Sequence, residues 1–223
     1  VDGGQVEDSA IIAYRLARLI NCPVVATGEE DYVSDGTRVF AVPHGHPIMT
    51  AVTGTGCLLG AVLAAFFSAY YPYKNRLSIG EFLAYALAYY GLAGESAVQV
   101  SGVKPGSFSV AFMDSLYALD DAVLISENRI RPIVVPDQLQ VYFISGTQDV
   151  ELNEHRLLSI VEDACRGGVT CFQFREKGAG TLVGQQKLEL AQQLKQICAK
   201  YNVLYVINDD VDLAMAVNAD GVH

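Results

Sequence analysis

The second part of the chain alternates between short apolar runs and longer stretches in which apolar residues recur every three or four positions. Short apolar runs are typical of buried strands, and the longer recurrence indicates amphipathic helices. The pattern predicts strands and helices in alternation, beginning with a strand, over residues 140–145, 154–166, 169–174, 182–201, 203–207, 211–217 and 220–222. Such alternation favours a parallel α/β sheet, and the repeat suits about half of a (β/α)8 barrel of roughly 250 residues.

The first part is mainly helical, and its pattern is less regular. It predicts helices over residues 8–20, 55–70, 79–100 and 108–119, and strands over 24–27 and 38–42 joined by a hairpin-like connection over 28–37. The first helix is amphipathic, with an apolar side made of Ile11, Ile12, Leu16, Leu19 and Ile20. The helix 55–70 is apolar on most sides, so we expect it to be buried. Residues 126–138 carry two prolines, two arginines and no helical period, which predicts a linker.

Composition narrows the class of protein. The 223 residues are 51% apolar and 18% charged, which suits one large or two modest domains. The best candidate for a membrane span, residues 58–73, is shorter than the roughly 20 residues required, and a net charge of −10 disfavours nucleic acid as a partner. The five cysteines include no CxxC pair, which indicates a reduced, cytoplasmic protein. Four of them lie in apolar or amphipathic stretches and are expected to be core thiols, namely Cys22, Cys165, Cys171 and Cys198.

A first candidate site lies where an extended segment meets the helix 55–70, at the sequence TGTGC of residues 53–57. Gly54 and Gly56 allow the backbone to turn tightly and approach a ligand, and the free N–H groups at a helix start favour an anion. Cys57 falls in the first turn, where it can act as a base toward a substrate hydroxyl while the main chain holds a transferring phosphoryl group. The alternative is a glycine-rich turn into a buried helix with a core cysteine.

Residues 52–61, with the sequence VTGTGCLLGA, resemble the anion-hole segment of hydroxyethylthiazole kinase, a ribokinase-like enzyme. Further segments match in order, at Thr27-Gly28-Glu29, Asp31, Asp35-Gly36, His44-Gly45-His46-Pro47 and Pro105-Gly106-Ser107-Phe108. The resemblance implies a ribokinase-like α/β domain over residues 1–123. It also implies that Cys57 occupies the catalytic position and that Thr27 binds ATP. The anion hole and the thiazole-binding residues would be Gly54, Thr55 and Gly56. We expect His44, His46, Asp31 and Asp35 to shape turns.

A second candidate site is formed by the ends of two predicted strands. The sequence QFREK of residues 173–177 ends one strand, and Asn208-Asp209-Asp210 ends the next. Alternation sends Gln173, Arg175 and Lys177 to one side, at the edge of a parallel barrel where ligands bind, and the cations can clamp a diphosphate. Carboxylates there suit Mg²⁺. The alternatives are ordinary loop charges and a helix cap at Asp209 or Asp210.

This region resembles thiamine-phosphate synthase over residues 138–223, in the segments 168–177, 207–214 and 219–223. The resemblance implies the first half of a (β/α)8 TIM barrel. It also implies that Asp209 is a Mg²⁺ ligand and that the aminopyrimidine diphosphate is bound by Gln173, Phe174, Arg175, Glu176, Lys177 and Asn208. The reaction joins the pyrimidine methylene to the thiazole nitrogen and releases pyrophosphate.

The two families catalyse adjacent steps, so we expect an internal piece of a bifunctional thiamine-salvage enzyme. The kinase part covers residues 1–123, a linker 124–137 and the synthase part 138–223, with ATP as co-substrate, Mg²⁺ as cofactor and small molecules as partners. The kinase resemblance implies a homo-oligomer, and both families extend beyond the segments matched here. Two other interpretations stay open: a binding or regulatory module without turnover, and a structural piece whose unpaired strand edges need a partner.

Overall fold

The computed structural model describes residues 6–223. The chain divides into two compact units, Val1–Ile133 and Val134–His223. The division falls within the segment that the sequence predicts as a linker.

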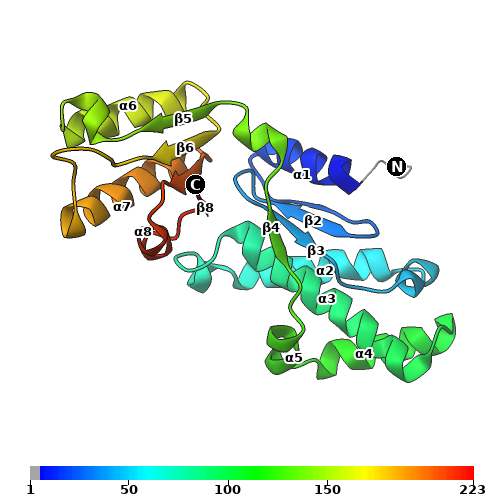
Figure 1. Cartoon of the computed structure of the whole chain (residues 1–223). Helices are drawn as coiled ribbons and strands as arrows, with labels where there is room; N and C mark the ends of the chain where they lie inside the picture. Colours follow the sequence, from blue (N-terminus) through cyan, green and yellow to red (C-terminus); the bar gives the residue numbers. More distant parts are fainter. Residues whose placement is uncertain (1–5) are drawn as a thin grey trace. The chain divides into compact units, whose positions relative to one another are not determined.

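The first unit contains a four-stranded antiparallel sheet in the order β1-β2-β3-β4 (Figure 1). The strands are β1 (Val24–Ala26), β2 (Asp31–Ser34), β3 (Val39–Val42) and β4 (Arg131–Ile133). The sequence pattern missed β2, which lies in the expected connection, and β4, which lies in the expected linker. Pro132 of β4 faces Phe40 of β3, and a proline is tolerated there because β4 is an edge strand of this sheet.

The hairpin between β2 and β3 is held by Asp35, as the sequence predicts. Its Oδ1 atom accepts hydrogen bonds from the N–H groups of Thr37 (3.0 Å) and Arg38 (2.8 Å). Its Oδ2 atom accepts a third from the N–H group of Gly80 at 3.2 Å. Asp35 therefore joins the turn to the start of a helix as well as closing it.

The helices of this unit are α1 (Val6–Ile20), α2 (Thr55–Ala69), α3 (Ile79–Ser101), α4 (Pro105–Ala118) and α5 (Asp121–Ser126), with short 3₁₀ turns at Pro47–Ala51 and Tyr71–Tyr73. The central helix is α3, which contacts α2, α4, β2 and β3. Figure 1 shows α2 beside α3. The Ser78 hydroxyl caps α3 by accepting from the N–H group of Glu81. Phe108 and Phe112 of α4 stack within the core that α3 builds.

Two helices differ from the sequence prediction in what they bury. On α1 the buried residues are Ala10, Ala13, Tyr14 and Ala17, whereas Leu19 is 81% exposed. The small side chains let α1 lie close to the sheet, and the aliphatic side predicted to be buried faces outward. On α2 only Leu59 is buried, because its main neighbour is α3 alone. The core position expected for Cys22 is also wrong, since this thiol is exposed.

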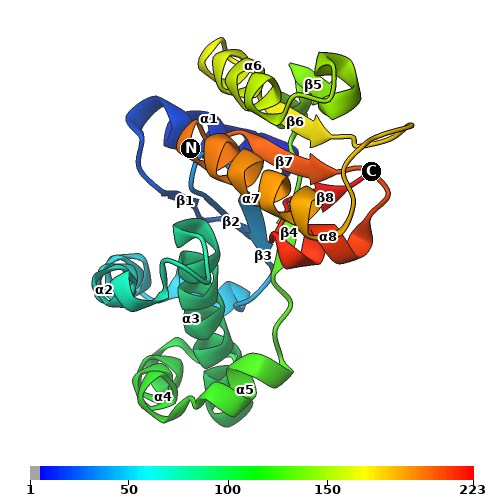
Figure 2. The ribbon, with the colours of Figure 1, turned by 90° about the vertical axis from the view of Figure 1, so that its left-hand side faces the viewer.

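The second unit confirms the predicted alternation of strands and helices. It contains β5 (Tyr142–Ser145), α6 (Glu154–Arg166), β6 (Cys171–Phe174), α7 (Gly184–Lys200), β7 (Leu204–Ile207), α8 (Val211–Ala216) and β8 (Gly221–Val222), after 3₁₀ turns at Pro136–Leu139 and Thr147–Val150. All strand pairs are parallel, in the order β5-β6-β7-β8. Ser145, Phe174 and Ile207 stand side by side in register, so three strands end at one edge of the sheet. In Figure 2, α7 runs along β7.

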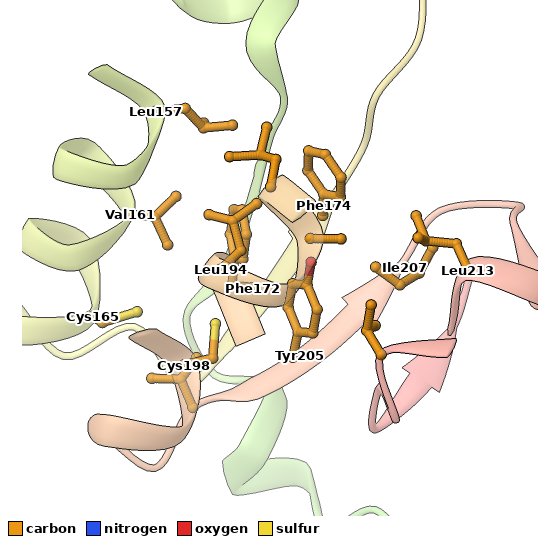
Figure 3. Packing of buried hydrophobic residues seen from close by; sticks show 14 of the residues in the cluster. Leu157, Val161, Cys165, Phe172, Phe174, Leu194, Cys198, Tyr205, Ile207 and Leu213 are labelled. Carbon is orange, nitrogen blue, oxygen red and sulfur yellow. The ribbon is translucent and has the colours of Figure 1, made fainter. Parts of the chain in front are cut away.

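One face of this sheet packs against α6 and α7 (Figure 3). Phe172, Phe174 and Tyr205 lie on that face among leucines of the helices. Side chains alternate between faces along a strand, so Gln173 points to the opposite face. This places an amide on the side of the sheet that a (β/α)8 barrel turns inward. Within residues 6–223, no helix combines the length and the apolar character that a bilayer span requires.

Candidate functional sites

The first unit contains a pocket of about 660 Å³. Four separate segments line it: the β1–β2 connection, the loop after β3, the start of α2 and the middle of α3. The lining residues are Thr27, Gly28, Glu29, Asp31, His44, Gly45, His46, Pro47, Met49, Thr50, Thr55, Gly56, Leu59, Tyr90 and Gly91. Three residues predicted from two separate segments, Thr27 from one and Thr55 and Gly56 from the other, therefore share one cavity. Gly54 and Cys57 adjoin it and are exposed.

The start of α2 has the geometry expected of an anion hole. Gly54 precedes the helix with φ of 98°, a left-handed conformation that favours glycine. The first helical hydrogen bond runs from the N–H group of Leu58 to the Gly54 carbonyl at 2.9 Å. The N–H groups of Gly56 and Cys57 precede this bond, in the first turn from which helices bind anions.

The turn before α2 is fixed from two sides. The Thr55 hydroxyl lies 2.8 Å from the Met49 carbonyl and 3.1 Å from the Val52 carbonyl, to which it can donate. The Tyr90 hydroxyl of α3 donates to the Thr55 carbonyl at 2.5 Å. Burial raises the pKa of Tyr90 to about 12, so its proton is retained. These bonds hold the main chain in place and engage the Thr55 hydroxyl internally.

The two histidines of the pocket wall have structural roles, as the sequence predicts. Nδ1 of His46 accepts from the N–H group of Ile48 and caps the turn Pro47–Ala51. His44 is buried, and its Nε2 atom accepts from the N–H group of Arg129 at 3.2 Å. Burial and the Arg129 guanidinium lower the pKa of His44, which keeps it neutral at pH 7.

Arg129 and Glu95 support the same wall from outside the predicted motifs. The Arg129 guanidinium bonds to Glu95, and the Glu95 carboxylate accepts from the N–H group of Gly45 at 2.8 Å. Gly91 faces this loop, and a side chain there would put its first carbon 2.5 Å from His44. Arg129 lies in the segment that the sequence predicts as a linker, and its only local signal is the charge of that segment.

Asp31 lines the pocket and was predicted only as a turn residue. Its Oδ1 atom accepts from the N–H group of Gly28 at 2.9 Å. Burial raises the pKa of Asp31 to about 6, against an opposing contribution from the Gly28 hydrogen bond. A carboxylate at the wall of a cavity with a pKa shifted this far marks a candidate functional residue.

The second site lies where β6 and β7 end, and we call Gln173, Lys177, Asn208 and Asp209 the strand-end site. The Gln173 amide donates to the Asn208 side-chain oxygen at 3.1 Å. The Asn208 amide donates to Asp209 Oδ2 at 2.9 Å. Lys177 forms an ion pair with the same carboxylate. Four of the residues predicted from two separate segments are therefore joined in one chain of contacts.

Asp209 has an unusual backbone, with φ of 61°. This left-handed conformation is uncommon outside glycine and is often found at functional sites. Its N–H group donates to the carbonyl of His223 at 2.9 Å. Lys177 holds the pKa of Asp209 below its usual range, so the carboxylate is charged at neutral pH.

The side chains of the other three residues predicted at this site lie outside its chain of contacts, although the Phe174 carbonyl accepts from the N–H group of Asn208 at 3.1 Å. Phe174 is 1% exposed and packs in the core. Arg175 is exposed, and its N–H group donates to the Ser145 carbonyl. The strand ends at Phe174, so the alternation that places Gln173 no longer governs Arg175.

Glu176 bonds to two loops of its own unit. Its carboxylate accepts from the N–H groups of Thr147 and Leu182, each at 2.9 Å, and from the Thr147 hydroxyl. It therefore ties the loop after β5 to the loop before α7. Asp210 is a helix cap, which was one of the open alternatives: it accepts from the N–H group of Leu213 at 3.0 Å and pairs with Lys187.

Comparison with known proteins assigns both regions. Residues 1–122 match the family model of the hydroxyethylthiazole kinase family. The chain belongs to this family. Residues 141–223 match the model of thiamine monophosphate synthase. The two matched regions contain the unit 1 pocket and the strand-end site, respectively.

Relatives with both and with single regions are known. The thiamine biosynthesis bifunctional protein ThiM/ThiE of Symbiobacterium thermophilum is 37% identical over 228 residues, covering 100% of this chain and 44% of the relative. Thiamine-phosphate synthase 1 of Streptococcus pneumoniae is 55% identical over 85 residues, covering 38% of this chain and 40% of the relative. The structure of a hydroxyethylthiazole kinase protein from Pyrococcus horikoshii superposes with a TM-score of 0.50 at 34% identity, covering 57% of this chain and 47% of that one. The chain spans less than half the length of each.

The strand-end site could bind magnesium through a single protein carboxylate. Asp209 is charged and 61% exposed at its side chain. No group of three or more His, Cys, Asp or Glu side chains within residues 6–223 is arranged to hold a metal ion. Mg²⁺ usually keeps several waters and binds through one or two carboxylates together with substrate phosphates. Asp209 therefore fits as the protein's contribution to such a site, with a diphosphate completing it.

Proposed function

We propose that the chain carries two consecutive sites of thiamine phosphate biosynthesis. The first unit phosphorylates hydroxyethylthiazole with ATP. The second couples hydroxymethylpyrimidine diphosphate with thiazole phosphate and releases pyrophosphate. The observation that carries the proposal is that each family-matched region brings its predicted phosphate-binding residues, distant in sequence, to one place.

In the kinase step, the main chain at the start of α2 binds the transferring phosphoryl group. The N–H groups of Gly56 and Cys57 point out of the first turn, and the helix dipole favours the negative charge there. The substrate hydroxyl attacks the terminal phosphorus, ADP departs, and the hydroxyl proton passes to Cys57 as the base. Gly54 contacts the thiazole alcohol, and Thr27 contacts ATP from another wall of the pocket.

In the coupling step, the strand-end site binds the diphosphate of the pyrimidine substrate. Gln173 and Asn208 offer amides, and Lys177 offers a cation. The Lys177–Asp209 pair supplies both binding groups at once, because a diphosphate that attracts Lys177 releases the Asp209 carboxylate. Magnesium held there would neutralise charge growing on the departing pyrophosphate. Arg175 and Glu176 stay predicted ligands of the same substrate, as does Phe174.

The cofactors, the partners and the cellular compartment of the protein follow from the same proposal. ATP serves as co-substrate and Mg²⁺ as cofactor, and the partners are small molecules. The five cysteines are free thiols, which suits the reducing cytoplasm. We expect the kinase unit to work as a homo-oligomer, and neither nucleic acid nor membrane to be a partner.

Two assays on the chain test the proposal. Incubation with hydroxyethylthiazole, ATP and Mg²⁺ should yield thiazole phosphate and ADP. Incubation with hydroxymethylpyrimidine diphosphate, thiazole phosphate and Mg²⁺ should yield thiamine phosphate and pyrophosphate. Equilibrium binding of the pyrimidine diphosphate, measured in parallel, separates an enzyme from a binding module. Binding without either reaction would contradict the proposed catalysis, and absence of binding would contradict the site itself.

A further inference from the structure

The β1–β2 connection forms one wall of the unit 1 pocket, and the half-buried carboxylate of Asp31 bonds to its main chain. Thr27, Gly28 and Glu29 line the cavity from this connection. Asp31 follows at the first position of β2, opposite Val42 of β3, so its backbone is fixed by the sheet. From that fixed position it reaches back to the N–H group of Gly28 at 2.9 Å. Glu30 ties the end of the connection to the sheet as well, through the Tyr32 hydroxyl of β2 at 2.6 Å and the Arg131 guanidinium of β4. The Asp31 carboxylate is the group that bonds to Gly28, in the part of the connection that lines the cavity.

A carboxylate at this place carries a desolvation cost that a neutral side chain would not. Burial disfavours its charged form and raises the pKa of Asp31 to about 6. The other titratable groups lining the pocket are Glu29, His44, His46 and Tyr90. His44 is neutral because its pKa is lowered, and Tyr90 is neutral because its pKa is raised to about 12, so neither offsets the charge. A neutral asparagine would accept the same hydrogen bond without this burial cost.

We propose that Asp31 is a positioning residue for nucleotide binding: its carboxylate fixes the Gly28 N–H group and thereby the Thr27–Gly28 turn that faces the cavity. This inference rests on the proposed kinase function, in which Thr27 contacts ATP. Charge-assisted hydrogen bonds are roughly twice as strong as neutral ones, which explains a carboxylate at this position. Asp31 acts through the main chain of Gly28 and is not itself a ligand of the nucleotide.

Three variants distinguish this positioning role from the effect of a negative charge at the pocket wall on the binding of an anionic nucleotide. Asp31→Ala removes the acceptor, Asp31→Asn keeps the acceptor without the charge, and Glu29→Gln removes the same charge from the same wall. Titration calorimetry with ATP and magnesium chloride at pH 8 should give affinities roughly threefold weaker for Asp31→Asn and about tenfold weaker for Asp31→Ala. Glu29→Gln should bind at least as tightly as the wild type. Undiminished affinity in Asp31→Ala would overturn the inference.

The pH profile gives a readout that a merely structural role would not move. Below about pH 6 the protonated Asp31 resembles asparagine, so the threefold advantage of the wild type over Asp31→Asn should fall to about one at pH 5. The Gly28 amide signal in a nuclear magnetic resonance titration should shift near the same pH in the wild type and stay constant in Asp31→Asn. This comparison remains decisive if Asp31→Ala does not fold. A constant ratio across this pH range would contradict the inference.

The failures of the two proposals are distinguishable. ATP affinity that equals the wild-type value in all three variants contradicts the role of Asp31 and leaves the kinase function standing. Absence of ATP binding by the wild type contradicts the kinase function and the inference together. In that case the Gly28 titration still decides whether Asp31 holds the turn.

Discussion

Asp31 and Asp209 belong to the two candidate sites and have opposite environments. Asp31 is half-buried at the wall of a cavity, bonded to a backbone N–H group, with a pKa raised to about 6. Asp209 is exposed at the end of a strand, paired with Lys177, with a lowered pKa. The first carboxylate is suited to holding the main chain, and the second to meeting a cation or a charged ligand.

The difference extends to the sites as wholes. The unit 1 pocket is built from main chain, and its polar side chains bond to the protein: Thr55 to the preceding turn, Tyr90 to Thr55 and His44 to Arg129. The charged side chains of the strand-end site, Lys177 and Asp209, are exposed to solvent, whereas Gln173 beneath them is buried. Function at the first site therefore depends on backbone shape, and at the second on individual charges. Salt should weaken ligand binding more at the strand-end site, because exposed charges are screened.

The largest expected effect on stability concerns Asp31→Asn. The folded pKa of about 6 lies above the ordinary 3.8, so the folded state binds the proton more tightly, and the free energy of unfolding decreases as pH rises from about 4 to about 6. The substitution removes this penalty. We expect it to stabilise the first unit by up to about 3 kcal/mol at pH 7 and to leave stability unchanged at pH 3.5. Urea denaturation at the two pH values measures the change in the free energy of unfolding. Equal changes at both pH values would show that the pKa of Asp31 is not raised in the folded protein.

The next effect concerns Asp209→Ala. Loss of the carboxylate should weaken binding of pyrophosphate with magnesium by at least about 100-fold, because removing even an outer partner of a metal ligand costs roughly 10- to 100-fold and Asp209 is the proposed ligand itself. Asp212→Ala is the matched control, because Asp212 is an exposed carboxylate three residues further along the same segment. Calorimetric titration of both variants distinguishes them. Equal weakening in the two would indicate a diffuse charge effect in place of a site.

Glu176→Ala tests whether Glu176, a predicted ligand of the pyrimidine diphosphate, chiefly stabilises the loops to which it bonds. It leaves the N–H groups of Thr147 and Leu182 without their acceptor, and we expect a loss of about 2 kcal/mol in the free energy of unfolding. Glu189, exposed on α7, is the control and should change stability by less than about 0.5 kcal/mol when replaced by alanine. Chemical denaturation of the pair gives the comparison. A stable Glu176→Ala protein that loses pyrimidine diphosphate binding would instead establish Glu176 as a ligand.

The smallest expected effect concerns Tyr205→Phe. The Tyr205 hydroxyl is buried in the second unit without a hydrogen-bond partner in the part of the chain that the structure describes. Removing it should leave stability unchanged or raise it by about 1 kcal/mol, because an unsatisfied buried polar group is costly. Thermal unfolding measures the change. A loss above about 1 kcal/mol would mean that an internal water satisfies this hydroxyl.

The sequence predicted the second unit well because its strands and helices alternate with clean periods. The sequence did not predict which faces of α1 and α2 are buried. Apolar residues lie on more faces of these helices than neighbouring elements cover, so periodicity could not identify the packed face. β4 was missed because a three-residue strand containing Pro132 carries no pattern of its own. Its existence depends on pairing with β3, about 90 residues earlier in the chain.

The candidate sites divide in the same way. Gly54, Gly56 and Cys57 were predicted because they form one local motif, and Lys177 and Asp209 because each closely follows a strand. The supporting residues were not found. Tyr90 and Arg129 reach the pocket from distant segments, and the reach of Asp31 to Gly28 is visible only once the strand and turn have formed.

The most direct test of the central claim, that each unit holds its own phosphate site, is a crossed assay of both reactions. Cys57→Ala and Asp209→Ala are prepared in the same chain, and thiazole phosphorylation and thiamine phosphate formation are measured for each. We predict that Cys57→Ala reduces phosphorylation and spares coupling, and that Asp209→Ala does the reverse. Loss of both reactions in either variant, with folding intact by circular dichroism, would contradict the account.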